Sequence, residues 1–128
     1  MQLMVEVSVG EVIDKVTILE LKLQNMSDAA KLANVRTELD TLNGSLQGVA
    51  DNVELARLKA ELFAVNAALW VIEDDIRLCE ARGDFGPRFV ALARSVYVTN
   101  DKRATIKKQI NLAVGSRLIE EKSYAGSL

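Results

Sequence analysis

The chain has 128 residues, few aromatic side chains (5%) and a formal net charge of −2, so we expect one domain, residues 1–128, with an aliphatic core. The charge argues against a nucleic-acid partner, which usually meets a basic surface. With no histidine and one cysteine, Cys79, the composition excludes Ser-His and Cys-His catalysis, imidazole metal ligands and an internal disulfide.

The N-terminal segment reads as a short strand followed by a buried helix. Gln2–Val7 is rich in β-branched residues with short alternation. The next residues, SVGE, match a capping box in which Ser8 is the N-cap and Glu11 reaches back to it. The helix should run to about Met26, because apolar residues recur every 3 or 4 positions: Val9, Val12, Val16, Leu19, Leu23 and Met26. Its wide apolar surface predicts neighbours on more than one side.

Two further helices follow, separated by turn signals. The second should begin beside Ser27 and Asp28, where the phase of the apolar stripe changes. Its stripe comprises Leu32, Val35, Leu39, Leu42 and Leu46. The third opens at DNVE, with Asp51 as N-cap, and ends at Gly83. Its heptad pattern is typical of a coiled-coil seam: Leu55, Leu58, Leu62, Val65, Leu69, Ile72, Ile76 and Cys79.

The fourth helix should begin at Pro87, with Gly86 as its cap, and stop at Gly115. Its seam holds two polar residues among the apolar ones: Phe89, Leu92, Val96, Thr99, Arg103, Ile106, Ile110 and Ala113. At 1.5 Å per residue, the last two helices would each span roughly 45 Å and the first only about 25 Å.

These lengths predict an all-α fold, an antiparallel bundle of four helices in which the hairpin of the last two projects past the others. The projection should cover roughly residues 69–97 and include Trp70. At the other end of the bundle, residues 2–7 and about 117–122 should lie together and could pair as short terminal strands, within one chain or across a dimer. A lone strand pair is marginal, so it would need the helices beneath it.

A polar stripe on the third helix suggests a ligand site. Asn66, Trp70 and Glu73 follow one face, at the level of the Arg103 region of the fourth helix. Since a buried arginine needs a partner, the simpler interpretation is that Arg103 pairs with Glu73 or Asn66 and fixes the register of the helices. The sharper one is a pocket for a small anion, which arginine suits. Its candidate residues are Asn66, Glu73, Tyr97, Asn100 and Arg103.

The remaining charged motifs point to no catalysis. Consecutive helical residues face about 100° apart, so Glu73, Asp74 and Asp75 cannot all meet one metal and read as a solvated edge. Asp14 and Lys15 read as an exposed charge pair or, alternatively, as a polar spot near the C-terminal tail. We therefore predict no catalytic residue, no metal site and no cofactor.

The projecting hairpin predicts a homodimer. Its apolar side chains outnumber those that a two-helix seam can cover, and large exposed apolar patches usually mark an interface. Two hairpins paired by a two-fold axis would form a local four-helix bundle. The candidate interface residues are Trp70, Phe85, Phe89 and Val96.

Three stretches together resemble a family of small bacterial and phage proteins classed as a domain of unknown function. They are VSVGEVIDKVTILELK, ALWVIEDDIRLCE with FGPRFVALARSVYVTNDKRATIKKQIN, and the closing EEKSY. The resemblance covers nearly the whole chain and implies no activity. The first helix also superficially resembles that of helical chorismate mutases, but that family supplies an arginine from this helix and residues 8–26 contain none.

We therefore expect a non-enzymatic helical interaction or scaffold module that self-associates through the hairpin. The alternative is a magnesium-dependent enzyme or binder that acts on a small phosphate-bearing ligand in an interhelical pocket, using Glu73, Asp74 and Asp101. The first ten residues lack the features of a signal peptide, and the apolar run 62–72 is shorter than the roughly 20 residues of a membrane span. We expect a cytoplasmic location and no membrane partner.

Overall fold

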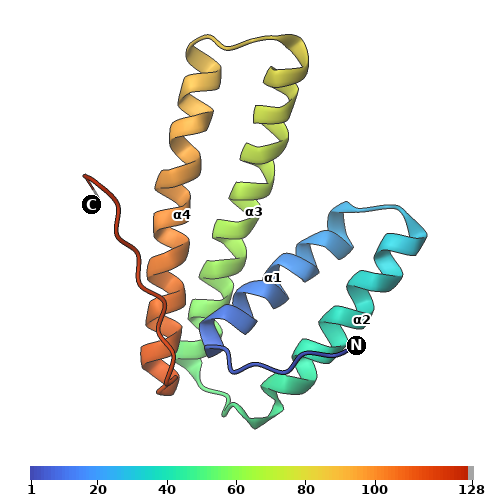
Figure 1. The fold of residues 1–128 in the computed structure, drawn as a ribbon, viewed down its shortest axis with the longest axis vertical. Coiled ribbons are helices and arrows are strands. Elements are labelled where there is room, and N and C mark those ends of the chain that lie inside the picture. The colour runs from blue at the N-terminus through green and yellow to red at the C-terminus, as the bar shows by residue number, and fades with distance from the viewer. Residues whose placement is uncertain (127–128) are drawn as a thin grey trace.

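The fold is a hairpin of two long helices with two shorter helices beside its base, the first of which packs against the hairpin and the second against the first (Figure 1). The computed structural model describes residues 1–126. Its elements are α1 (Val9–Asn25), α2 (Ala29–Ser45), the short 3₁₀ helix η1 (Leu46–Gly48), α3 (Val53–Arg82) and α4 (Pro87–Val114). The all-α class is confirmed, and the far half of the α3–α4 hairpin stands clear of α1 and α2.

The helices begin and end where local signals in the sequence place them. The Ser8 hydroxyl accepts a hydrogen bond from the Glu11 backbone N–H at 3.2 Å and so caps α1. Gly83 and Gly115 end α3 and α4 with φ angles of 66° and 68°, a left-handed conformation that glycine adopts without steric cost. Pro87 occupies the first turn of α4, as predicted.

The predicted N-cap of α3 is wrong by one residue. Asn52, not Asp51, is the N-cap, and its side-chain oxygen accepts from the Leu55 backbone N–H at 2.7 Å. Asparagine and aspartate are equally good N-caps, so the DN pair alone does not decide between the two residues.

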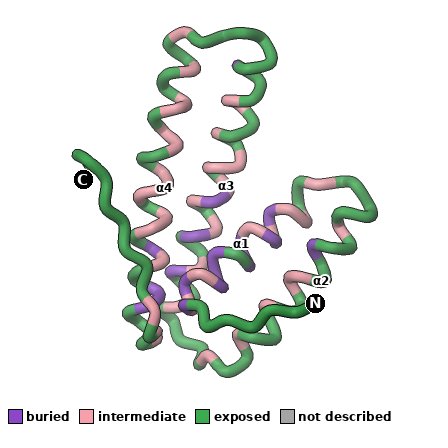
Figure 2. The backbone as a smooth tube through the Cα atoms, viewed as in Figure 1, coloured by how far each residue is buried: buried purple, intermediate pink, exposed green. Residues whose placement is uncertain are grey.

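The core lies at the base of the hairpin, where α1 contacts α2, α3 and α4. Its central cluster comes from three helices: Ile13, Leu58, Leu62, Ile106 and Ile110. Figure 2 shows the buried residues gathered at this crossing, while the projecting hairpin is mostly exposed or half-buried. Of residues 69–97, Cys79 alone is buried. In the projecting hairpin, α3 and α4 therefore pack against each other, but no other element within residues 1–126 covers their outer faces.

The predicted pairing of short terminal strands is wrong, because no residue from 1 to 126 lies in a strand. The two segments do leave the same end of the fold, where Arg117 pairs with Glu6. Beyond Arg117, however, the tail runs back along α4, and Glu120 and Glu121 form ion pairs with lysines of that helix. These ion pairs hold the tail on α4, so the tail does not run beside residues 2–7 as a strand partner.

Candidate functional site

A buried ion pair joins α1 to α4 at the base of the hairpin. The Asp14 carboxylate is 1% exposed and accepts two hydrogen bonds from Arg103, one from Nε at 2.9 Å and one from Nη2 at 2.5 Å. This is the bidentate geometry in which arginine binds carboxylates most strongly. The bonds to Asp14 raise the pKa of Arg103, although partial burial opposes the shift. The arginine therefore stays charged in this environment.

Asn66 and Thr17 complete the network around Asp14. The Asn66 amide donates to the Asp14 carboxylate and to the Thr17 hydroxyl, each at 2.9 Å. The Thr17 hydroxyl in turn donates to the Asp14 backbone carbonyl at 2.7 Å. The network thus ties α1, α3 and α4 together at one point. Among residues 1–126, no buried side-chain nitrogen or oxygen lacks a hydrogen-bond partner.

The sequence predicted such a contact for Arg103 but not its partner. We expected Glu73 or Asn66 to pair with the arginine and Asp14 to be exposed, whereas Asp14 supplies the acid and Asn66 binds that acid. Lys15, the neighbour of Asp14, is the exposed member and pairs with Glu38 of α2. One signal in the sequence could have predicted this pair: Asp14 on α1 and Arg103 on α4 are opposite charges that each lie among apolar residues.

One of the cavities adjoining this network, called here the Trp70 cavity, has a volume of about 370 Å³. It is lined by Ile18 and Leu21 of α1, by Asn66, Leu69, Trp70, Glu73 and Asp74 of α3, and by Asn100 and Arg103 of α4. Four of the five predicted ligand-binding residues therefore meet in one place. Tyr97 does not: its side chain is 54% exposed, and it lines a separate cavity with Tyr124 of the tail.

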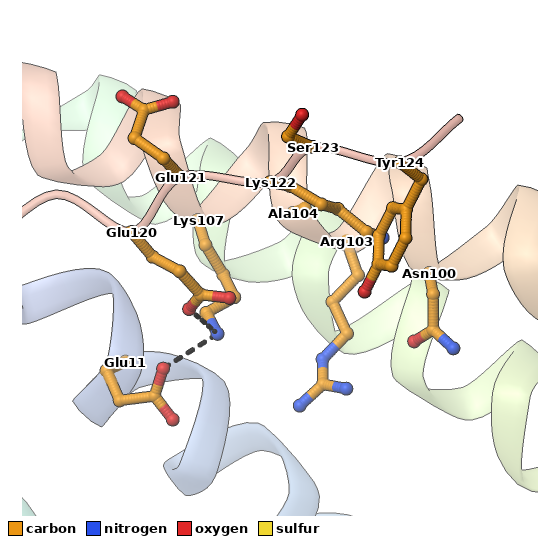
Figure 3. Close-up of a pocket in the computed structure, with 10 residues that line it drawn as sticks. All are labelled: Glu11, Asn100, Arg103, Ala104, Lys107, Glu120, Glu121, Lys122, Ser123 and Tyr124. Atoms are coloured by element: carbon orange, nitrogen blue, oxygen red, sulfur yellow. Dashed lines mark hydrogen bonds and ion pairs between the residues drawn. The ribbon is translucent and has the colours of Figure 1, made fainter. Parts of the chain in front are cut away.

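A second cavity, the tail cavity, has a volume of about 610 Å³ and lies between α4 and the C-terminal tail (Figure 3). No pattern in the sequence predicted this cavity, although the closing EKSY residues form one of its walls. Figure 3 shows the Tyr124 side chain reaching from the tail toward Asn100 and Arg103. Asn100 and Arg103 therefore line both this cavity and the Trp70 cavity.

Lys107 is the most enclosed cation of the tail cavity. Its side chain is 12% exposed, and its ammonium donates to Glu11 of α1 at 2.7 Å and to Glu120 of the tail at 3.1 Å. Burial lowers the pKa of Lys107, but the bonds to these two acids and the charges of Asp14 and Glu11 together raise it by more, so the pKa lies above its ordinary value. The Glu11 carboxylate thus binds Lys107, while the Ser8 hydroxyl caps α1.

The acidic residues of α3 have ordinary helix-surface partners. Glu73 lies 3.7 Å from Arg77 one turn away, and Asp75 lies 3.9 Å from Arg88 on α4. Asp101, which the magnesium alternative required, pairs with Lys122 of the tail at 2.7 Å. Within residues 1–126, no group of three or more His, Cys, Asp or Glu side chains is placed to hold a metal ion.

The predicted interface residues lie on the projecting hairpin. Trp70, Phe89 and Val96 are half-buried, and Phe85 in the loop between the helices is exposed. The rings of Phe85 and Phe89 pack edge to face, with their centroids 5.3 Å apart. This pair covers part of the hairpin tip and leaves the flanks open.

Comparison with known proteins gives a family but no activity. A family model described as "Family of unknown function (DUF6165)" matches residues 3–128. No curated protein and no solved structure matches the chain. No helix within residues 1–126 has both the length and the apolar character needed to cross a membrane.

Proposed function

We propose that this chain, which belongs to the family of unknown function DUF6165, is a non-enzymatic helical interaction module that pairs with a second copy of itself through the α3–α4 hairpin. The observation that carries the proposal is that Cys79 alone is buried among residues 69–97. A layer of two helices hides only its own seam, and folds normally cover such a layer with another. A second hairpin would supply that layer.

The second copy would pack on the face of the α3–α4 hairpin that α1 covers at the base. This face continues beyond α1 toward the hairpin tip. On α4, Phe89, Val96 and Arg103 follow one another at seven-residue spacing, so they share one face of the helix. Arg103 and Asn66 both contact α1, whereas Val96 and Phe89 lie beyond that contact along the hairpin. Trp70 lies one helical turn beyond Asn66 on α3. The same apolar face therefore extends past the part that α1 covers.

Charge and symmetry favour a second copy over an unrelated partner. A two-fold pairing of hairpins places α3 of one protomer beside α4 of the other in a local four-helix bundle. Asp74 of α3 and Arg94 of α4 are both exposed, and neither has an ion-pair partner among residues 1–126. Opposite charges on the two helices suit the rim of an interface between identical copies.

Light scattering during size-exclusion chromatography tests the proposal. We expect the unmodified protein to show twice its chain mass of 14.0 kDa. Phe89→Asp should shift the protein to the single-chain mass, because burying such a side chain contributes about 1.5–3 kcal/mol. Circular dichroism checks that the variant keeps its helices.

Val98→Asp is the matched control. Val98 is a 43% exposed apolar residue of the same helix, but it lies off the face shared by Phe89, Val96 and Arg103. This variant should keep the dimer mass. A single-chain mass for the unmodified protein, or equal loss of the dimer in both variants, contradicts the proposal.

A further inference from the structure

The Trp70 cavity has the size and the lining of a small-molecule site. Its volume of about 370 Å³ falls within the roughly 300–1,000 Å³ range of ligand pockets. Its apolar lining residues are Ile18, Leu21, Leu69 and Trp70. Its polar lining residues include Arg103 and Asn100 of α4. This combination suits a ligand with an apolar body and a polar head group.

Arg103 lines the cavity, and Asp14 engages only part of its guanidinium. A guanidinium has five N–H groups, and Asp14 occupies one on Nε and one on Nη2. No residue from 1 to 126 accepts a hydrogen bond from Nη1, and the side chain is 29% exposed. Because the buried Asp14 holds the plane of the guanidinium, the remaining donors are oriented before any ligand arrives. Asp14 does not line the cavity, so a ligand would meet the donors and not the acid.

Asn100 adds a second donor beside Arg103. Its side chain is half-buried and has no hydrogen-bond partner among residues 1–126. An amide and a guanidinium that face the same space can both donate to the oxygens of one carboxylate or phosphate group.

The acids of the cavity set the direction in which a ligand would lie. Glu73 and Asp74 follow Asn66 by seven and eight residues on α3, which is about 10 Å of helix rise. Asn66 lies at the Arg103 end, because both side chains bind Asp14. An anionic group is therefore favoured at the Arg103 end and repelled at the Glu73 end.

We propose that the Trp70 cavity binds a small organic anion, with its carboxylate or phosphate group on Arg103 and Asn100 and its apolar body against Trp70. All the residues that line the site belong to one protomer, so a single chain is enough to form it. A carboxylate and a phosphate ester share the chemistry that these donors recognise, and the experiment separates them.

The fluorescence of Trp70 reports on the cavity directly, because it is the single tryptophan of the chain. We expect phenyl phosphate, benzoate or both to change its emission saturably at millimolar concentrations. Benzyl alcohol, which has the apolar body without the charge, should give no saturable change. Inorganic phosphate, which has the charge without the body, should bind more weakly than phenyl phosphate. The proposal is overturned if neither phenyl phosphate nor benzoate changes the emission saturably, or if benzyl alcohol gives an equal saturable change.

A pair of matched variants assigns the binding to the cavity. Asn100→Ala should weaken binding of the aromatic anion about tenfold, the effect of losing one hydrogen bond to a charged group. Asn43→Ala changes an exposed asparagine of α2 and should leave the affinity unchanged. Equal affinity in the two variants overturns the assignment. Repeating the titration with Phe89→Asp, where we expect unchanged affinity, separates ligand binding from any effect of self-association on Trp70.

Discussion

Gly10 and Asn111 bring the first turn of α1 against the last turn of α4. The Gly10 backbone N–H donates to the Asn111 side-chain oxygen at 2.6 Å, and both residues are buried. A Cβ atom at position 10 would lie 2.5 Å from the backbone carbonyl oxygen of Lys107 and 2.8 Å from that side-chain oxygen. The close approach of the two helices therefore depends on the absence of a side chain at residue 10.

Gly10→Ala should destabilise the fold by about 1–3 kcal/mol, the usual cost of forcing a methyl group into a packed site, because backbone atoms cannot move aside locally. Gly44→Ala is the matched control. A methyl group on Gly44, in α2, would have no atom within 4 Å, so alanine should stabilise the helix by about 0.5–1 kcal/mol. Urea denaturation measures both. Destabilisation of equal size in the two variants would contradict the role assigned to Gly10.

Asp14→Ala should lower the free energy of unfolding by about 3 kcal/mol. This is the lower end of the range for breaking a buried ion pair, because Arg103 keeps some contact with water. The double variant Asp14→Leu with Arg103→Met should recover most of the loss, since it leaves no unpaired charge. Lys15→Ala removes the neighbouring exposed ion pair and should cost at most about 1 kcal/mol. Similar losses for Asp14→Ala and Lys15→Ala in denaturant unfolding would argue against the network.

Lys107 should make the stability depend on pH in the alkaline range. A pKa raised in the folded protein means that the protonated ammonium stabilises the fold. This contribution is fully present below the unfolded pKa of about 10.4 and is lost as the pH rises through the folded value. Lys107→Arg keeps its charge in this range, so its unfolding free energy should fall less between about pH 9 and pH 11.5 than that of the unmodified protein. Parallel decreases, measured by denaturant unfolding, would rule out this role for Lys107.

The helix ends were predictable because their causes are local. The cap at Ser8 and the left-handed glycines 83 and 115 depend on a few adjacent residues, and the structure confirms each of them. The length difference between α1 and the hairpin helices follows from these ends and from the turn signals at Ser27–Asp28, Asp51–Asn52 and Pro87, which place the other ends to within about one residue. It was therefore possible to predict the projecting hairpin without knowing any contact between helices.

The partner of Arg103 and the course of the tail were not predictable in this way. Asp14 and Arg103 are 89 positions apart, and only the angle at which α1 crosses the hairpin brings them together. The tail had two possible partners, the segment 2–7 and the lysines of α4. The choice depends on whether ion pairs with α4 or strand hydrogen bonds with residues 2–7 stabilise the tail more. The periodicity of apolar residues does not report on either contribution.

Because Arg103 and Asn100 line both the Trp70 cavity and the tail cavity, the two spaces share one wall. A molecule that binds these side chains in one cavity changes the charge and the hydrogen bonds that they offer to the tail in the other. Thermodynamic linkage makes such an effect reciprocal, so the factor by which occupancy changes the docking of residues 120–124 equals the factor by which docking changes affinity. The position of the tail would then report whether the Trp70 cavity is filled.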